Sequence, residues 1–201
     1  MKTREHKGNS IIAFPNEYIS IDIETTGLDF DYDEIIEISA ILVRNGAIVD
    51  QYSSLVKPHH SHAFLTLSDI NKLGFNCFSE MPEDLEKEFF ETHLIPQYIE
   101  SLTGISNSEL LNAPYIESIL PNIFSFLGTH ILVGHNIHFD INFLYDAFEN
   151  AGLYLKNDFV DTMRISKKLL PDLPHHRLKD VVDKYKISQD CAHRAYADAS
   201  A

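Results

Sequence analysis

Hydrophobic and polar positions alternate in the first well-patterned segment of the chain. Across residues 18–24, three isoleucines fall on one face, whereas Ser20, Asp22 and Glu24 fall on the other. A period of two carried by β-branched residues is typical of a half-buried strand. We therefore expect a strand here, with its carboxylates on the face opposite the isoleucines.

A hairpin is expected next. A second apolar run over residues 35–43 is followed by Asn45-Gly46, a pair typical of tight hairpin turns. The return strand is expected over residues 47–56, because Pro58 cannot donate a backbone hydrogen bond to a sheet. Residues 1–14, ahead of the first strand, are interpreted as a polar lead-in.

The later part of the chain alternates helices with short strands. Apolar residues between 116 and 127 recur at helical spacing, which predicts an amphipathic helix. Short buried strands are expected at residues 131–133 and 159–160, and further helices near 82–91, 106–109, 139–148, 162–170 and 176–186. A hairpin followed by strands that alternate with helices predicts an α/β fold with a mixed sheet.

Composition places the chain among ordinary globular proteins. It has 201 residues, of which 44% are hydrophobic, so one domain with one sizeable core is expected. No run approaches the roughly 18 apolar residues that a membrane helix needs, so no membrane partner is expected. The two cysteines do not make a disulfide framework, which favours a cytoplasmic location.

The charge of the chain limits how it could hold a polyanion. The formal net charge is −14, which argues against a broad electrostatic grip on a phosphate backbone. It does not argue against a site that holds divalent cations. We expect a footprint of a few nucleotides, or delivery of the substrate by a partner.

Asp22 and Glu24 are the first candidates for chemistry. They lie two residues apart at the end of the predicted strand, so both side chains point to the same face. Two neighbouring carboxylates repel unless a cation lies between them, and hard oxygen ligands suit Mg²⁺ or Mn²⁺. The alternative is a solvated pair at a strand end.

Three further residues are weaker candidates when each is taken alone. Asp140 falls in the first turn of a predicted helix, where an acid is favoured by the helix dipole in any case. Asp198 could be an ordinary surface acid. His193 could act as a general base near neutral pH, or be one of 11 histidines at the surface.

The combination is more specific than its parts. Three segments occur in order: IDIETTGL at residues 21–28, VGHNIHFD at 133–140 and HRAYAD at 193–198. Together they resemble the DEDDh 3′–5′ exonucleases, the family that includes the proofreading epsilon subunits of bacterial replicases. The resemblance covers about residues 17–58 and 100–198.

The resemblance implies a ribonuclease-H-like fold with a five-stranded mixed sheet whose second strand is antiparallel to the others. It implies two divalent cations, Mg²⁺ or Mn²⁺. Asp22, Glu24 and Asp198 would hold the first cation, and Asp22 with Asp140 the second. His193 would take the proton from the attacking water, and the products would be nucleoside 5′-monophosphates.

The residues beside the carboxylates are candidates for binding the strand end. Backbone at Thr25, Thr26 and Gly27 could approach the terminal sugar. Leu28 and Phe139 could lie against the terminal bases, or could be core residues. Asn136 could contact the substrate or cap its helix.

The chain departs from the family between Pro58 and Leu102. Here 43 residues replace what is usually a short connection, so we expect a single domain over 1–201 with an insertion at about 59–100. The insertion could be a lid or docking element, or an inert surface excursion. The helix that carries Asp198 has little sequence after it, so we expect it to be weakly anchored.

These observations favour a metal-dependent exonuclease acting on single-stranded or frayed 3′ ends, with DNA favoured over RNA and a proofreading role beside a DNA polymerase left open. An RNA-trimming enzyme or a small-nucleotide phosphodiesterase could use the same site. A non-catalytic binding module would carry a substitution among the five candidate residues, and none is present.

Overall fold

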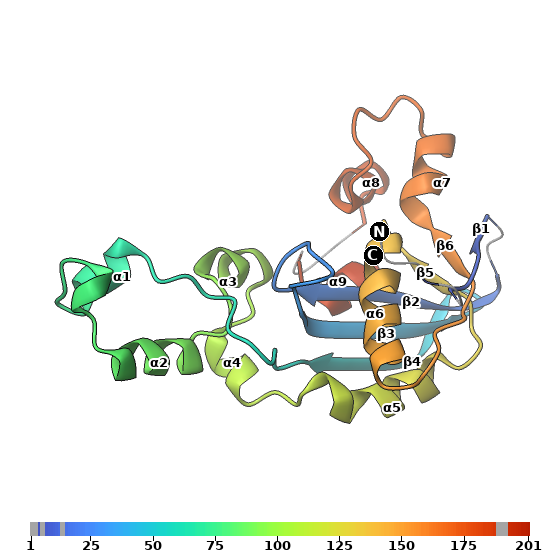
Figure 1. Ribbon diagram of the computed structural model, residues 1–201. Coiled ribbons are helices and arrows are strands. Elements are labelled where there is room, and N and C mark those ends of the chain that lie inside the picture. Colours follow the sequence, from blue (N-terminus) through green and yellow to red (C-terminus); the bar gives the residue numbers. More distant parts are fainter. Residues whose placement is uncertain (1–3, 5–6, 13–14, 188–192) are drawn as a thin grey trace.

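The computed structural model describes residues 4, 7–12, 15–187 and 193–201. A mixed sheet with strand order β1-β6-β5-β2-β3-β4 forms the centre of the molecule (Figure 1). Its strands are β1 (Ser10–Ile11), β2 (Glu17–Thr25), β3 (Ile35–Arg44), β4 (Ala47–Leu55), β5 (Leu132–Gly134) and β6 (Phe159–Asp161). The helices are α1 (Leu67–Lys72), α2 (Glu83–Thr92), α3 (Gln97–Thr103), α4 (Asn107–Leu111), α5 (Ile116–Leu127), α6 (His138–Asn150), α7 (Thr162–Leu169), α8 (Leu178–Tyr185) and α9 (Ala195–Ser200).

The predicted α/β class and strand directions are confirmed. β3 runs antiparallel to β2 and β4, whereas β2, β5 and β6 are parallel to one another. The hairpin turn has positive φ at both Asn45 (51°) and Gly46 (76°), as tight two-residue turns require.

The predicted number of strands is wrong by one. The sheet has six strands, because Ser10–Ile11 pairs in parallel with β6 at the edge. The backbone of Asn9 holds this edge: its carbonyl accepts from the N–H of Phe159, and its N–H donates to the carboxylate of Asp158. A strand of two residues leaves no alternation to detect, so the segment looked like a polar lead-in.

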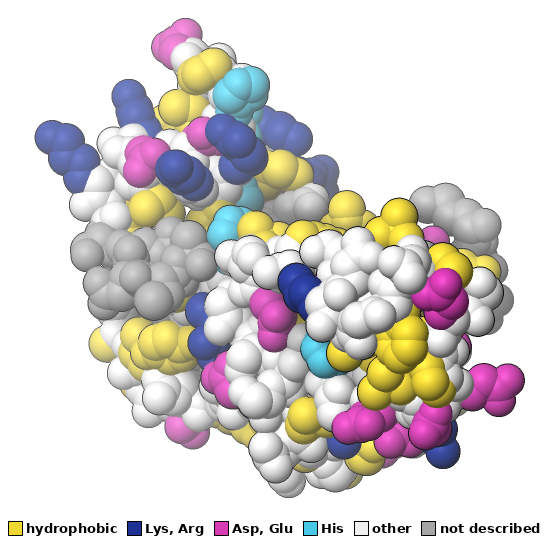
Figure 2. Space-filling view, turned by 90° about the vertical axis from the view of Figure 1, so that its left-hand side faces the viewer, with side chains coloured by type: hydrophobic (Ala, Val, Ile, Leu, Met, Phe, Trp, Pro, Cys, Tyr) yellow, Lys and Arg dark blue, Asp and Glu magenta, His cyan; other side chains and the backbone are white. Residues whose placement is uncertain are grey.

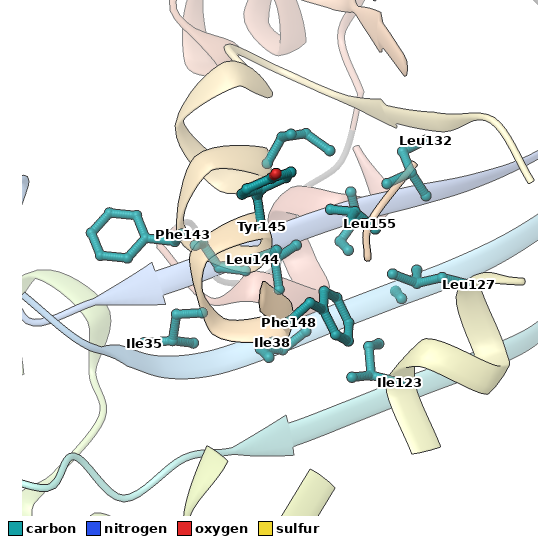
Figure 3. Close-up of a cluster of buried hydrophobic side chains, with 14 of the residues drawn as sticks. Ile35, Ile38, Ile123, Leu127, Leu132, Phe143, Leu144, Tyr145, Phe148 and Leu155 are labelled. Atoms are coloured by element: carbon teal, nitrogen blue, oxygen red, sulfur yellow. The ribbon is translucent and has the colours of Figure 1, made fainter. Parts of the chain in front are cut away.

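The main hydrophobic core lies between the sheet and helices α5 and α6 (Figure 3). Ile19, Ile21 and Ile23 of β2 are buried on this face, which confirms the alternation. Phe148 and Leu144 of α6 are fully buried against them. The polar residues of β2 therefore emerge on the opposite face.

The insertion extends from one end of the sheet with helices α1 and α2 outermost (Figure 1). A second, smaller cluster of buried residues fixes its base: Ile36, Leu94, Ile95, Ile99, Ile105 and Leu110. Glu34 ties the start of the insertion to the loop after β2, because its carboxylate accepts from the N–H groups of His59 and His60 and lies 2.9 Å from Nε2 of His62.

Helices α7 and α8 form an arm that rises above the sheet, at the top of Figure 1. Within the described residues, no helix is both long enough and apolar enough to cross a membrane.

Candidate active site

Three carboxylates meet beside the end of β2. Asp22 and Glu24 project from the polar face of the strand, and Asp198 comes from α9. One oxygen from each of the three lies within 4.8 Å of the other two. Residues from opposite ends of the sequence are thus brought into a single cluster of negative charge.

Asp198 is placed by the start of α9. The guanidinium of Arg194 binds Glu37 of β3 at two points, with an Nη2–Oε1 distance of 2.8 Å. The same carboxylate accepts the N–H of Ala195 at 2.8 Å, and Ala195 and Ala199 are buried against the sheet. The expectation of a weakly anchored helix is wrong, since the anchor precedes Asp198 and does not depend on the few residues after it.

Asp140 adjoins the cluster without being one of its three carboxylates. It is only 4% exposed, in the first turn of α6, and its Oδ1 accepts the N–H of Ile23 at 3.0 Å. The pairing of β2 with β5 ends at Ser20, so the N–H of Ile23 has no strand partner on that side. Asp140 therefore supplies the missing hydrogen-bond acceptor for the backbone of β2 between Asp22 and Glu24.

Burial and the crowding of negative charge both raise pKa values in the site. Burial, and then the charges of Asp198 and Glu37, raise the pKa of Glu24 to about 8. Burial raises the pKa of Asp140 to about 7, and burial together with Asp140 raises the pKa of Asp22 well above its ordinary value. Without a cation these groups compete for protons, which is the behaviour expected of carboxylates grouped to bind metal.

His193 occupies the turn just before α9. Its side chain is exposed, and its φ of 61° lies in the left-handed region. It is five residues from Asp198 and is not one of the three clustered groups. Residues 188–192, which precede it, lie outside the described part of the chain.

The loop after β2 is organised by its threonines. Thr26 is buried, and its hydroxyl donates to Asp33 and accepts the N–H of Glu34. The hydroxyl of Thr25 donates to the carbonyl of Gly27 at 2.5 Å. A Cβ on Gly27 would lie 2.4 Å from a carboxylate oxygen of Asp33, so glycine is needed there for the packing of the loop itself.

The predicted base contacts differ in exposure. Leu28 is 80% exposed, which excludes its interpretation as a core residue. Phe139 is half-buried, with its ring centroid 5.7 Å from Phe30 and 5.0 Å from Phe143. Asn136 is exposed, and α6 begins without a side-chain cap, so the capping interpretation of Asn136 is wrong.

Three further residues support the site, although the sequence patterns assigned them no such role. Glu37 and Arg194 form the anchor of α9, and Asp161 accepts the N–H groups of Asn136 and Met163 at the point where β6 becomes α7. Glu37 pairs in register with Glu24, two acids facing each other across β2 and β3. The available signal was an acid, Glu37, within an otherwise apolar strand. A buried acid needs a partner, so its position indicated a cation or a basic residue nearby.

Comparison with known proteins identifies the family. The model of the exonuclease (RNase T) family matches residues 19–88 and 78–201, which is most of the chain. The chain belongs to the exonuclease family. This confirms the resemblance drawn from the three motifs.

The curated relatives of this exonuclease include components of DNA polymerase III. The PolC-type DNA polymerase III of Halalkalibacterium halodurans is 33% identical over 187 residues, which cover 92% of this chain and 11% of the relative. The epsilon subunit of Aquifex aeolicus DNA polymerase III is 28% identical over 184 residues, which cover 91% of this chain and 75% of the relative. The chain thus spans about a tenth of the length of the PolC-type relatives it matches.

Solved structures with the same fold are also exonucleases. E. coli exonuclease I in complex with a dT13 oligonucleotide superposes with a TM-score of 0.66 at 18% identity, covering 92% of this chain and 39% of that one. Exonuclease X in complex with 5′ overhanging duplex DNA gives 0.60 at 21% identity, covering 90% and 83%. At these identities the likeness establishes the fold.

Proposed function

We propose that this exonuclease is a metal-dependent 3′–5′ enzyme that releases nucleoside 5′-monophosphates from single-stranded or frayed 3′ ends. The observation that carries the proposal is the cluster of Asp22, Glu24 and Asp198, whose oxygens lie within 4.8 Å of one another. Removing a nucleotide requires water to attack a phosphodiester that is itself negatively charged. Cations held by clustered carboxylates would neutralise that charge.

The cluster fits hard divalent cations. All its ligand atoms are carboxylate oxygens, the type that Mg²⁺ and Mn²⁺ prefer. Burial, and then the charges of neighbouring acids, raise the pKa values of Asp22 and Glu24, and a bound cation would stabilise their charged forms. Asp22, Glu24 and Asp198 would hold one cation, and Asp22 with Asp140 a second. When bound, the cations neutralise charge on the reacting phosphate and lower the pKa of the attacking water.

The protein's own residues would orient the reaction. His193 lies at the surface next to the helix of Asp198, where its imidazole can reach solvent and take a proton from water. Asp140 holds the backbone between Asp22 and Glu24, so it fixes the spacing of both side chains. The exposed Leu28 on the loop after β2 presents an apolar surface to the last bases of a strand.

DNA is the favoured polymer because the curated relatives at 28–33% identity are DNA polymerase III proteins. The same relatives support a proofreading role beside a polymerase as part of the proposal. An RNA-trimming activity would use the same residues, so the polymer has to be determined by experiment.

The test uses oligonucleotides labelled at the 5′ end, in DNA and RNA versions, single-stranded and 3′-recessed. Each is incubated with the chain and Mg²⁺, Mn²⁺ or EDTA, and the products are separated by length. A ladder that shortens from the 3′ end with either metal and disappears in EDTA supports the proposal. Shortening from the 5′ end, or activity that persists in EDTA and in Asp198→Asn, would contradict it.

A further inference from the structure

The net charge of −14 is unevenly distributed, because one segment of the chain is basic. Residues 162–187, which hold α7, α8 and the turn between them, carry seven Lys and Arg against three Asp. The rest of the chain carries nine Lys and Arg against 27 Asp and Glu. This arm is therefore a positively charged segment on a strongly acidic protein.

The basic residues of the arm are available at its surface (Figure 2). Figure 2 shows Lys and Arg gathered on the part of the molecule that rises at the top, whereas Asp and Glu gather low on the near side. Five exposed lysines form no ion pair within the described residues: Lys167, Lys168, Lys179, Lys184 and Lys186. Among the described residues, no acid pairs with their charge.

The base of the arm forms a wall of the active site. A cavity of about 180 Å³ is lined by Asp22, Asp198, His135 and Leu178, the first residue of α8. His135 ties the turn before α8 to the end of β5, since its Nε2 lies 2.6 Å from the carbonyl of His176. On the other side, Ser166 of α7 contacts Nδ1 of His176 at 3.1 Å. The two helices of the arm are thus joined next to the carboxylates.

We propose that the α7–α8 arm binds the sugar–phosphate backbone of the nucleic-acid substrate while the 3′ end lies at Asp22, Glu24 and Asp198. This inference rests on the proposed function and adds to it the surface that holds the rest of the strand. Unpaired lysines attract phosphates, release their counterions and make binding dependent on salt. The acidic surface elsewhere repels the strand and leaves the arm as its favoured path.

The expected footprint changes accordingly. From net charge alone, a contact of a few nucleotides was expected. An arm with five exposed lysines offers the phosphates of a longer strand contacts in addition to those at the carboxylates, whereas a dinucleotide has only one internucleotide phosphate. Strand length, not the terminal nucleotide, then determines affinity.

The decisive experiment measures binding without hydrolysis. A fluorescent single strand is titrated with the protein in EDTA at about 50–200 mM salt, and its anisotropy gives Kd. The arm variant is Lys167→Gln/Lys168→Gln/Lys179→Gln/Lys184→Gln. A rise in Kd of about tenfold or more and a smaller slope of log Kd against log salt are expected.

A matched control separates the arm from total charge. Lys72→Gln/Lys87→Gln changes exposed lysines on the insertion, and the pair Lys179→Gln/Lys184→Gln gives an arm variant of equal charge change. If the control weakens binding as much as the arm pair does, or if neither the quadruple variant's Kd nor its salt slope changes, the arm is not the binding surface.

Hydrolysis of a dinucleotide tests the proposed function separately. The arm variants should cleave it at the wild-type rate with Mg²⁺ or Mn²⁺, because its single internucleotide phosphate lies at the carboxylates and leaves no further phosphate for the lysines. If the wild-type protein cleaves neither the dinucleotide nor the long strand, the proposed function is wrong, whatever the binding measurements show. If cleavage is normal and the arm variants bind the long strand as the wild type does, only the proposal about the arm is wrong.

Discussion

Arg194 and Glu37 form a two-point ion pair that fixes the start of α9. Glu37 is 3% exposed on β3, and its second oxygen also accepts the N–H of Ala195. Because Asp198 lies one helical turn further on, the geometry of the carboxylate cluster depends on a residue that is not part of it. This relationship makes Glu37 a positioning residue for Asp198.

Glu37→Gln should therefore weaken cation binding at a distance. The amide keeps an acceptor for Ala195 but loses the charge that holds Arg194, so α9 should shift. We expect the Mg²⁺ or Mn²⁺ concentration for half-maximal activity to rise about 10-fold, with the rate at saturating metal changed less. The measurement is a metal titration of exonuclease activity.

Glu17→Gln is the matched control, since Glu17 forms a similar two-point pair with Arg44 on the surface of the same sheet. Equal metal dependence in both variants would show that Glu37 has only a general structural role.

Asp140 should respond differently to two substitutions. Asp140→Asn retains an oxygen for the N–H of Ile23, so stability should be near wild type while activity is lost. Asp140→Ala leaves that buried N–H without a partner and should cost about 1–3 kcal/mol as well. Denaturant unfolding and the oligonucleotide assay measure the two effects. Full activity in Asp140→Asn would remove this residue from the proposed second cation site.

Removing one clustered carboxylate should stabilise the protein when no metal is present. Asp198→Asn relieves the repulsion that helps raise the pKa of Glu24. We expect the free energy of unfolding in EDTA to increase by about 1 kcal/mol. The same variant should lose the additional stability that Mg²⁺ gives the wild type.

Thermal unfolding with and without Mg²⁺ is the appropriate measurement. Asp50→Asn, which changes an exposed acid on β4, serves as the control. A variant at Asp198 that is still stabilised by Mg²⁺ to the wild-type extent would argue against its role as a ligand.

His193→Ala should separate proton transfer from metal binding. If His193 is the general base, the rate should fall by about 10²–10⁴-fold while stabilisation by Mg²⁺ is preserved. Single-turnover kinetics and the same thermal assay measure both properties. Loss of metal binding together with the rate would instead assign His193 to the metal site.

The attachment of the insertion should depend on pH. Burial raises the pKa of Glu34, but hydrogen bonds from His62 and His59 outweigh burial and bring it to about 2. Burial lowers the pKa of His59, whereas its bond to Glu34 raises it to a net value above the ordinary 6.5. The contribution of Glu34 is therefore complete above about pH 4.5 and lost as the pH falls toward 2.

The stabilisation by His59 has the opposite pH dependence: it is complete below pH 6.5 and is lost as the pH rises through the raised pKa of His59. Glu34→Gln should cost about 1–3 kcal/mol of unfolding free energy between about pH 5 and 6.5, and less on either side. Glu117→Gln, which removes only the more exposed partner of His59, should show a smaller effect. Unfolding in urea across pH measures both, and a pH-independent cost for Glu34→Gln would contradict this account.

The strength of the local patterns decided how much of the fold could be predicted. The pleat of β2 placed Asp22 and Glu24 on one face, and the Asn45-Gly46 turn set the hairpin, because both signals act over neighbouring residues. β1 was missed because two residues of edge pairing depend on backbone contacts with β6, which no side-chain pattern records.

The supporting groups of the site were harder to predict for the same reason. Glu37 meets Arg194 across 157 positions, and Asp140 meets the N–H of Ile23 across 117. Such pairs follow from the folded register and not from spacing along the chain. The candidate roles of Asp22, Glu24, Asp140, His193 and Asp198 came from the motifs, and they stay predictions until the variants are measured.

The pleat of β2 links correct folding to catalytic competence. A slip of one residue against β3 would turn Asp22 and Glu24 into the layer of isoleucines and bring Ile21 and Ile23 outward in their place. Burying two unpaired carboxylates there would cost several kcal/mol, a large part of the stability of a domain of this size. A chain with this mispaired register would therefore be unstable. Every stably folded molecule then has Asp22 and Glu24 on the polar face of the sheet.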